Sequence, residues 1–465
     1  MSERYDAIII GTGIGGAAIG ALLAHAGKKI LILEKNKEVG GRCTSYEQDG
    51  FTVDLGTHLF GVGAKGHIGE VLRQVEAPNA LEWVTIKNSM MQIGRIRKNY
   101  SRKTMMEVLP KGESENIEKL FREAAAMPDQ ELDELWYVPL SEWVGRFTSD
   151  PLGQTLIESI SSQYFALDMK DTSTTEFIKC FREVVSARSS AYPKGGCIAI
   201  PKAYIDIITK YGGKLATKAK AEKIIIENQA AVGVKVKGGS DYFAPIIISN
   251  ADIKHTVTDL VGKEHFSVDY VQRIENLSWS YHLLSLKVAL NEKVTDDQLV
   301  MYMPNNFYPI LKISEEMWTG KVPELVGGMI VSPSNYDPSL APTGHQLISF
   351  CTACPPKQDW KKWGKALLDS FYAVYPEAEG KVLWHRLDTP DFINAVGFED
   401  GNTIGTGQTV NQVHERRPSV VSPLKGLYFS SAEAGGHGIG TELAADSAQE
   451  LFAILVADKS LGIGK

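Results

Sequence analysis

The sequence predicts an α/β protein with a parallel sheet at its N-terminus and a second domain built on a mixed sheet. The apolar run Ala7 to Ile10 indicates a buried strand, an Ala- and Leu-rich stretch indicates a helix, and the apolar run Lys29 to Leu33 indicates a second strand. This order is a βαβ unit. The length of 465 residues exceeds what one hydrophobic core usually serves, so we expect two domains.

The turn after the first strand has the glycine spacing of a dinucleotide-binding site. It reads Gly11-Thr12-Gly13-Ile14-Gly15-Gly16 and opens the helix-prone stretch that ends near Gly27. The first glycine allows a tight turn, the second lets backbone approach a pyrophosphate, and the last lets the helix pack on the sheet. Free N–H groups at the helix N-terminus favour an anion. The alternative is a glycine-tolerant turn that binds nothing.

Glu34 and the residues after it narrow the class of dinucleotide. The carboxylate of Glu34 follows the second strand, where it would accept hydrogen bonds from a ribose diol and repel a 2′-phosphate. Gly40 and Gly41 permit a close backbone pass, and Arg42 offers a planar cation to phosphate. Together with Asp54-Leu55-Gly56-Thr57-His58, this segment resembles the FAD-dependent superfamily of amine oxidases, protoporphyrinogen oxidase and phytoene desaturases. The resemblance implies FAD as the cofactor.

Four later segments are similar to the phytoene desaturase-like branch of this superfamily, which includes carotenoid and retinoid oxidoreductases. They are Tyr192 to Gly196, Ile246 to Asp252, Asp337 to Gly344, and Gly435 to Glu442. FAD is expected to be non-covalent, because no Cys or His stands where it would tether the flavin. The resemblance implies FAD contacts from Gly11, Gly13, Ile14, Gly15, Gly16, Glu34, Lys35, Gly40, Gly41, Arg42, Gly56, Thr57, His58, Ala251, Glu433, Gly440 and Thr441.

The C-terminal segment departs from the pattern of this branch at one place. The branch has Gly-Asp directly after a strand, with the acid near the ribityl chain, whereas this chain has Ser430-Ser431-Ala432-Glu433. Either Glu433 takes that role from one position further along, or the hydroxyls of Ser430 and Ser431 bind the ribityl chain. A third interpretation is that Glu433 is only a loop carboxylate.

The resemblance implies a discontinuous Rossmann-type FAD-binding domain of the glutathione-reductase-like kind, because the glycine motifs must converge on one ligand. We assign residues 1–75, 193–265 and 420–465 to this domain. Residues 76–192 and 266–419 are expected to form an α+β substrate-binding domain with a mixed sheet and a helical lid.

The candidate catalytic residues are those in or near segments expected around the flavin: His58, His437, Glu433 and Arg386. A flavin accepts or donates hydride at N5, and a side chain or water must then handle a proton. The two histidines are explained equally well as packed or FAD-contacting imidazoles, and Arg386 as an ion-pair partner of Asp388.

The leading functional hypothesis is an FAD-dependent oxidoreductase that desaturates or saturates a C–C bond of an isoprenoid, carotenoid-like or other apolar substrate. Oxygen, a quinone or a partner protein would accept the electrons, because no second nucleotide-binding unit is present. The alternatives are a flavin-dependent isomerase without net redox change, an amine or porphyrinogen oxidase, and a non-catalytic prenyl-binding protein. The turn at Asp337 to Gly344 argues against the oxidases, and the retained FAD motifs argue against the non-catalytic protein.

Two further segments invite a functional interpretation. The aromatic stretch Trp136 to Phe147 indicates either an apolar substrate channel, with a membrane-facing surface, or packing inside the helical lid. The basic cluster is formed by Arg95, Arg97, Lys98, Arg102 and Lys103. It would meet phospholipid headgroups or a pyrophosphate-bearing substrate, or be a solvated hairpin.

Composition limits the partners and the compartment. The formal charge of −7 argues against general nucleic-acid binding. The N-terminus has no signal-peptide pattern, and no apolar stretch approaches the roughly 18 residues of a membrane span. Five scattered cysteines fit a reducing compartment, and Cys351 and Cys354 alone make no metal site, so we expect none. The expected location is cytoplasmic, with peripheral membrane contact as an option.

Overall fold

The apolar residues that were predicted to form the first strand are the centre of a five-stranded parallel sheet in the computed structural model. The model describes residues 4–56, 59–304, 319–355, 357–397, 399–459 and 462. The order of the sheet is β19, β13, β1, β2 and β9. These strands span Leu427–Phe429, Ile246–Ser249, Ala7–Ile10, Ile30–Leu33 and Lys214–Ala216. They come from the N-terminus, the middle and the C-terminus of the chain, as a discontinuous domain requires.

The two faces of this sheet are covered by different layers, because successive side chains of a strand point to opposite faces. Ala7 and Ile9 pack in one core with helices α1, α2, α9 and α16, and Ile8 and Ile10 pack in another with a three-stranded antiparallel sheet. The helices span Ile14–His25, His67–Gln74, Ala199–Lys210 and Thr441–Ala457. The strands β10, β11 and β12 span Ala221–Glu227, Ala230–Val236 and Asp241–Phe243. The predicted α/β fold class is confirmed.

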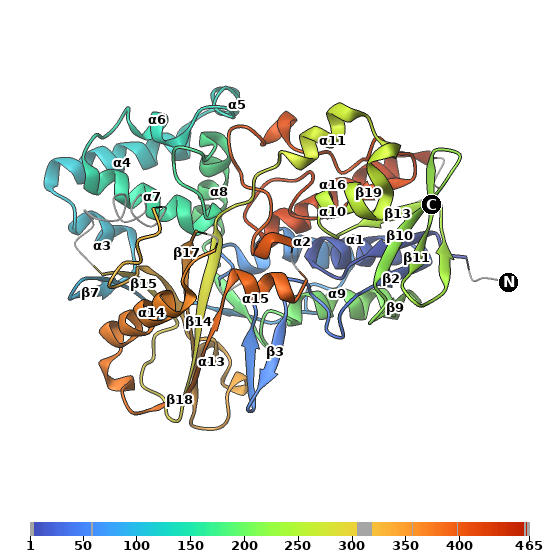
Figure 1. The fold of residues 1–465 in the computed structure, drawn as a ribbon. Helices are drawn as coiled ribbons and strands as arrows, with labels where there is room; N and C mark the ends of the chain where they lie inside the picture. Colours follow the sequence, from blue (N-terminus) through green and yellow to red (C-terminus); the bar gives the residue numbers. More distant parts are fainter. Residues whose placement is uncertain are drawn as a thin grey trace.

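A seven-stranded mixed sheet forms the second part of the molecule (Figure 1). Its order is β18, β14, β17, β16, β15, β6 and β7, and only the β15 and β6 pair is parallel among its described pairings. The strands span Val382–Asp388, His282–Leu290, Gln346–Cys354, Gly328–Val331, Leu299–Met303, Ser89–Ile93 and Ile96–Asn99. Helix α14 (Trp360–Val374) buries Trp363, Leu367 and Phe371 against this sheet.

A group of helices lies beside the seven-stranded sheet, at the upper left of Figure 1, and forms the helical lid. Helices α3 to α8 span Arg102–Glu107, Lys111–Ala126, Asp129–Asp133, Leu140–Val144, Pro151–Phe165 and Thr174–Ala187. Leu140, Trp143 and Val144 are buried in the common core of these helices, whereas the buried Trp136 stacks on His414 with ring centroids 4.6 Å apart. Of the two interpretations of the aromatic stretch Trp136 to Phe147, packing inside the lid is the one that the structure shows.

Short elements connect the larger ones. The strands β3, β4, β5 and β8 span Ser45–Gln48, Phe51–Asp54, Trp83–Thr85 and Ala191–Pro193. The helices α10, α11, α13 and α15 span Ile253–His255, Val268–Glu275, Pro333–Tyr336 and Pro390–Ala395. Helix α11 packs in the core of the parallel-sheet region through Val271 and Ile274, so that core extends beyond residue 265. The predicted domain boundaries stay a prediction.

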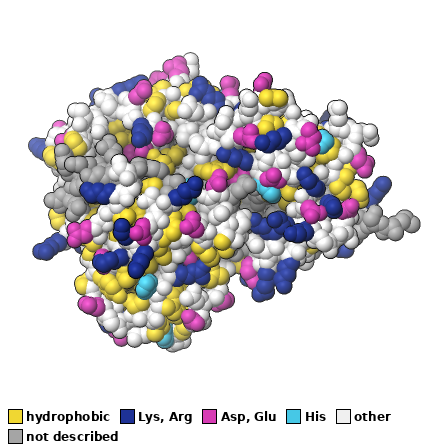
Figure 2. All heavy atoms as spheres, in the orientation of Figure 1, with side chains coloured by type: hydrophobic (Ala, Val, Ile, Leu, Met, Phe, Trp, Pro, Cys, Tyr) yellow, Lys and Arg dark blue, Asp and Glu magenta, His cyan; other side chains and the backbone are white. Residues whose placement is uncertain are grey.

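The surface carries charges of both signs. Figure 2 shows Lys and Arg side chains interspersed with Asp and Glu on the face drawn. Within the basic cluster, Arg97 pairs with Asp297, and Lys98 lies 3.0 Å from Glu107. The function of the basic cluster stays a prediction. Among the described residues, no helix is both long and apolar enough to cross a membrane.

Candidate dinucleotide-binding site

A cavity of about 1150 Å³ opens at the carboxyl ends of the parallel strands. Ile10, Leu33 and Asn250 line it from the ends of β1, β2 and β13, and Ser285 and Met329 line it from the seven-stranded sheet. In open α/β sheets, ligands bind outside the carboxyl ends of the strands. The cavity therefore lies where a dinucleotide is expected, and the seven-stranded sheet supplies one of its walls.

The glycine turn meets this cavity at the start of helix α1. Gly13 is the N-cap of that helix and no side chain caps it, so its first N–H groups point outward without a side-chain acceptor. A Cβ on Gly13 would collide with Asn250 Oδ1, and one on Gly15 with the carbonyl oxygen of Ser430. Asn250 Nδ2 donates to that same carbonyl at 2.6 Å. The glycines thus let three segments meet beneath an anion-binding helix end.

Glu34 holds the glycine turn as well as facing the cavity. One carboxylate oxygen, Oε2, accepts hydrogen bonds from the Thr12 amide at 3.0 Å and the Thr12 hydroxyl at 2.5 Å. The other, Oε1, accepts one from the Asn36 amide at 2.9 Å. A carboxylate has about four acceptor sites, so about one remains for a ribose hydroxyl. Sequence reasoning missed Thr12, whose place inside the glycine pattern was the available signal.

Arg42 and Glu433 meet at the cavity wall. Arg42 Nη2 lies 3.4 Å from Glu433 Oε1, and Glu433 Oε2 accepts a hydrogen bond from the Ile253 amide at 2.8 Å. Burial and the charge of Asp252 raise the pKa of Glu433 to about 7, against the opposing effects of Arg42 and Arg417. Glu433 is therefore a bound, buried carboxyl of the cavity wall. Its role toward a cofactor stays a prediction.

Two buried charged residues hold the C-terminal glycine turn, and sequence reasoning missed both. Glu176 of α8 accepts hydrogen bonds from the Gly438 amide at 2.7 Å and from Gln408 Nε2 at 3.0 Å. Arg417 donates to the carbonyl oxygens of Gly435 and Ala432, each at 2.6 Å. Burial raises the pKa of Glu176 to about 6 and lowers the pKa of Arg417 to about 10. No short motif marks either residue, because each acts on a turn far away in sequence.

The opposite end of the cavity is apolar and belongs to the lid. Its lining includes Tyr100, Met105, Phe121, Tyr164 and Phe181. Phe121 and Phe181 stack with ring centroids 5.1 Å apart. Burial raises the pKa of the Tyr164 hydroxyl far above its usual range, so it stays neutral. The aromatic lining thus comes from α4, α7, α8 and the segment before α3, and not from the predicted stretch Trp136 to Phe147.

The structure places most of the predicted cofactor contacts on the cavity wall. These are Gly11, Gly13, Ile14, Gly15, Glu34, Lys35, Gly40, Gly41, Arg42, Gly56, Ala251, Glu433, Gly440 and Thr441. Gly16 is not in the lining, because it packs against the backbone of Gly11 beneath the turn. Thr57 and His58 lie outside the described residues.

Two of the candidate catalytic residues do not line the cavity. Arg386 Nε lies 2.8 Å from Asp388 Oδ1, and its guanidinium stacks on Tyr46 and Phe392, which fixes it in β18 as an ion-pair partner. His437 packs beside the start of α16, where burial lowers the pKa of its ring. Glu433 is the one candidate among the described residues that reaches the cavity.

The fold and the cavity define a two-domain protein with a Rossmann-type dinucleotide-binding sheet. The family model described as an NAD(P)-binding Rossmann-like domain matches residues 9–75. These residues include the glycine turn, Glu34 and Arg42. The match therefore covers the part of the chain that forms the polar end of the cavity.

Curated relatives extend the similarity to most of the chain. Prolycopene isomerase 1 of an Oncidium hybrid cultivar is 28% identical over 390 residues, which are 76% of this chain and 64% of that relative. The all-trans-retinol 13,14-reductase of Danio rerio is 28% identical over 365 residues, 68% of this chain and 58% of that protein. The chain thus spans less than two thirds of the length of these relatives.

Solved structures share the fold over nearly the whole chain. An oxidoreductase from Methanosarcina mazei has a TM-score of 0.77 at 19% identity, covering 96% of this chain and 99% of that one. A triple mutant of putrescine oxidase has a TM-score of 0.73 at 13% identity, covering 98% and 99%. The comparisons confirm the predicted resemblance to carotenoid and retinoid enzymes, and the solved structures confirm the fold.

Proposed function

We propose that the chain binds FAD non-covalently in the cavity and exchanges a hydride at a C–C bond of an isoprenoid, carotenoid-like or other apolar substrate. One observation carries the proposal: the glycine-lined end and the aromatic end belong to one continuous space of about 1150 Å³. That volume exceeds the roughly 300–1000 Å³ of a site for one drug-sized ligand. The space suits a dinucleotide together with an apolar molecule.

The polar end fits FAD through groups that this chain supplies. The uncapped start of α1 offers backbone N–H groups to a pyrophosphate. Glu34 keeps about one acceptor site for a ribose hydroxyl, and Arg42 is held at the wall by Glu433. When bound, the flavin supplies the hydride chemistry at its N5 atom.

The apolar end would receive and orient the substrate. Phe121, Tyr164 and Phe181 offer flat apolar surfaces, which suit a polyene or an isoprenoid chain. With a substrate bound, the same side chains would keep water away from the space between the lid and the parallel sheet. An apolar environment protects a hydride transfer from competing reactions with water.

The test starts from the purified protein and its visible spectrum. We expect yellow protein whose FAD is released by acid or heat. Under anaerobic conditions, isoprenoids, carotenoids or retinoids should perturb or reduce the flavin, whereas polar amines should not. Reoxidation of the reduced protein by oxygen, by a quinone and by a redox protein would identify the electron acceptor.

Two results would contradict the proposal. Flavin reduction by an amine, with no response to any apolar ligand, would favour an amine oxidase. Colourless protein that cannot be reconstituted with FAD would favour the non-catalytic, prenyl-binding alternative.

Isomerisation without net redox change is a second candidate, because the chain is similar to prolycopene isomerase. The two candidates differ in their electron balance. A desaturase or saturase consumes one equivalent of oxidant or reductant for each product formed. An isomerase forms product with no such consumption, so product and flavin oxidation state should be measured in the same anaerobic sample.

A further inference from the structure

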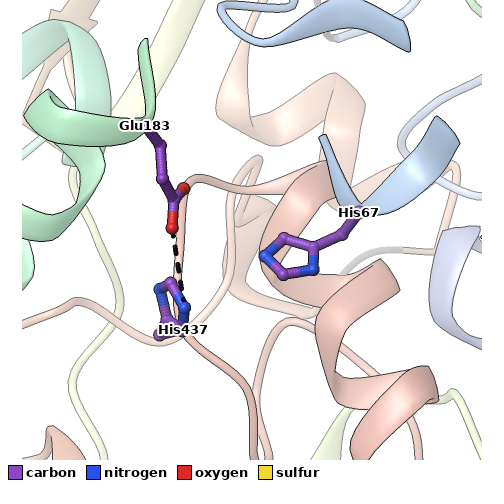
Figure 3. Close-up of side chains that lie close together, drawn as sticks. All are labelled: His67, Glu183 and His437. Atoms are coloured by element: carbon purple, nitrogen blue, oxygen red, sulfur yellow. Dashed lines mark ion pairs between the residues drawn. The ribbon is translucent and has the colours of Figure 1, made fainter. Parts of the chain in front are cut away.

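Three side chains able to bind a metal ion meet beside the cavity, although the sequence predicted no metal site. They are His67 at the start of α2, Glu183 of α8 and His437 in the turn before α16 (Figure 3). One ligand atom from each lies within 4.8 Å of the other two. Figure 3 shows the three side chains pointing toward a common space. Because they come from distant segments, no spacing motif reveals them.

The spacing of His437 and Glu183 suits two ligands of one ion. His437 Nε2 lies 3.6 Å from Glu183 Oε1, which is too long for a good hydrogen bond. Tetrahedral ligands at about 2.0–2.2 Å from a zinc ion stand roughly 3.3–3.6 Å apart. The other ring nitrogen, His437 Nδ1, is buried and has no hydrogen-bond partner within the described part of the chain.

Helix α16 orients both histidines from behind. His67 Nδ1 lies 2.9 Å from Gln449 Oε1 and 3.2 Å from Asp446 Oδ1. With the proton on Nδ1, the Nε2 lone pair of His67 is left for a metal ion. The backbone amide of His437 donates to Asp446 Oδ2 at 2.9 Å. A carboxylate that holds the far nitrogen of a histidine is the usual support of a histidine–metal bond.

The charges around the three side chains also favour a cation. Glu183 and Asp446 stand here, and the buried Glu442 lies close enough to interact with both His67 and Glu183. No ion pair found among the described residues joins these carboxylates to a lysine or an arginine. The nearby Lys179 instead lies over the Trp136 ring, 5.1 Å from its centroid.

We propose that His67, Glu183 and His437 bind a first-row divalent transition metal ion, with Zn²⁺ as the best match. Two imidazoles and one carboxylate are the ligand types of such ions, and they leave at least one coordination position open. The ion would join α8 of the lid to α2 and to the turn before α16 in the parallel-sheet region. Since Glu183 also lines the cavity, the ion would fix the lid wall beside the substrate space.

The test measures Zn²⁺ binding to the flavin-containing protein after EDTA treatment and desalting. Isothermal titration calorimetry should give one Zn²⁺ per chain at micromolar affinity or tighter, and no comparable signal with Mg²⁺. His67→Gln, Glu183→Gln and His437→Gln should each weaken Zn²⁺ binding at least tenfold. Co²⁺ in place of Zn²⁺ should add absorption bands at wavelengths longer than those of the flavin.

His265→Gln is the matched control, because His265 also stands near a glutamate, 3.9 Å from Glu264, but outside the cluster. It should bind Zn²⁺ like the wild type. The proposal is overturned if the wild type binds no stoichiometric Zn²⁺, or if the three cluster variants bind it with unchanged affinity. The flavin-to-protein ratio, recorded for every sample, keeps a failure of the FAD proposal separate from a failure of this one.

Discussion

Arg42 Nη2 lies 3.4 Å from Glu433 Oε1, although 391 residues separate them in the chain. The contact joins the turn after the second strand to the segment after the last strand. Both side chains line the cavity. Their contact therefore forms the wall at the polar end of the site. Glu433 is buried, and removing Arg42 leaves this carboxylate without its ion-pair partner.

Replacing Arg42 should therefore weaken FAD binding. For Arg42→Ala we expect a loss of about 1.5–3 kcal/mol, which is roughly 10- to 150-fold in the dissociation constant. FAD titration of the apo-protein measures the dissociation constant. In Arg42→Ala/Glu433→Gln the loss should be smaller than the sum of the single losses, because the double variant buries no unpaired charge. Arg73→Ala, which removes an exposed pair with Glu70, is the control and should bind FAD normally.

Gly13→Val should abolish FAD retention in a folded protein. The added Cβ would displace Asn250, whose amide holds the Ser430 carbonyl at 2.6 Å, and the branched side chain would crowd the start of α1. Gly112→Val is the control, because a Cβ there meets nothing within 4 Å. Flavin absorbance per protein and far-UV circular dichroism are the measurements. Normal flavin content in folded Gly13→Val would remove the assignment of the turn to the pyrophosphate.

Glu34→Gln should weaken FAD binding and also lower stability. A carboxamide can accept hydrogen bonds at only one end, so its NH₂ group would face either the Thr12 donors or the Asn36 amide. A buried donor left without an acceptor costs about 1–3 kcal/mol. Thermal unfolding and FAD titration measure the two effects. Glu38→Gln, which changes an exposed glutamate in the same loop, should leave both unchanged, and equal behaviour of the two variants would contradict the role of Glu34.

Glu158→Gln should stabilise the protein increasingly as the pH rises. Burial and the neighbouring Asp168 raise the pKa of Glu158 to about 8, whereas an unfolded glutamate titrates near pH ~4.3. Between these values the folded state binds more protons than the unfolded state, so raising the pH costs stability, by up to about 1.4 kcal/mol per pH unit. The amide oxygen of Gln can still accept from the Met169 amide. Unfolding midpoints of variant and wild type should diverge from pH 5 to about 8 and run parallel above; a constant difference would refute the pKa shift.

Phe181→Ala should weaken the binding of long apolar ligands. Phe181 lines the cavity and stacks on Phe121, so truncation removes contact area worth about 1.5 kcal/mol or more, roughly tenfold in affinity. Phe147→Ala is the matched control, since Phe147 packs on Trp143 away from the cavity. Difference spectra of the flavin with an isoprenoid series give the affinities. A larger effect of Phe147→Ala would indicate that the Trp136 to Phe147 stretch, and not Phe181, lines the substrate channel.

The sequence by itself determined the parallel-sheet region and the glycine turn. The βαβ unit is a local pattern, because strand, turn, helix and acid follow one another within about thirty residues and each has a backbone requirement of its own. A mixed sheet was also predicted for residues 76–192 and 266–419, and the seven-stranded sheet takes its strands from both stretches. The three stretches that form the parallel sheet could be grouped from the sequence because their glycine motifs must share one ligand.

Only the tertiary structure decided which side chains meet. Arg42 contacts Glu433, and His67 lies close to Glu183 and His437. The packing of helices and turns brings these residues together, and no sequence spacing predicts it. The sequence showed the aromatic-rich stretch Trp136 to Phe147 but not the orientation of its side chains. Side chains of a helix point in all directions, and the neighbouring helices determine which ones are buried in the core, as Trp143 is, and which face the cavity, as Phe181 does.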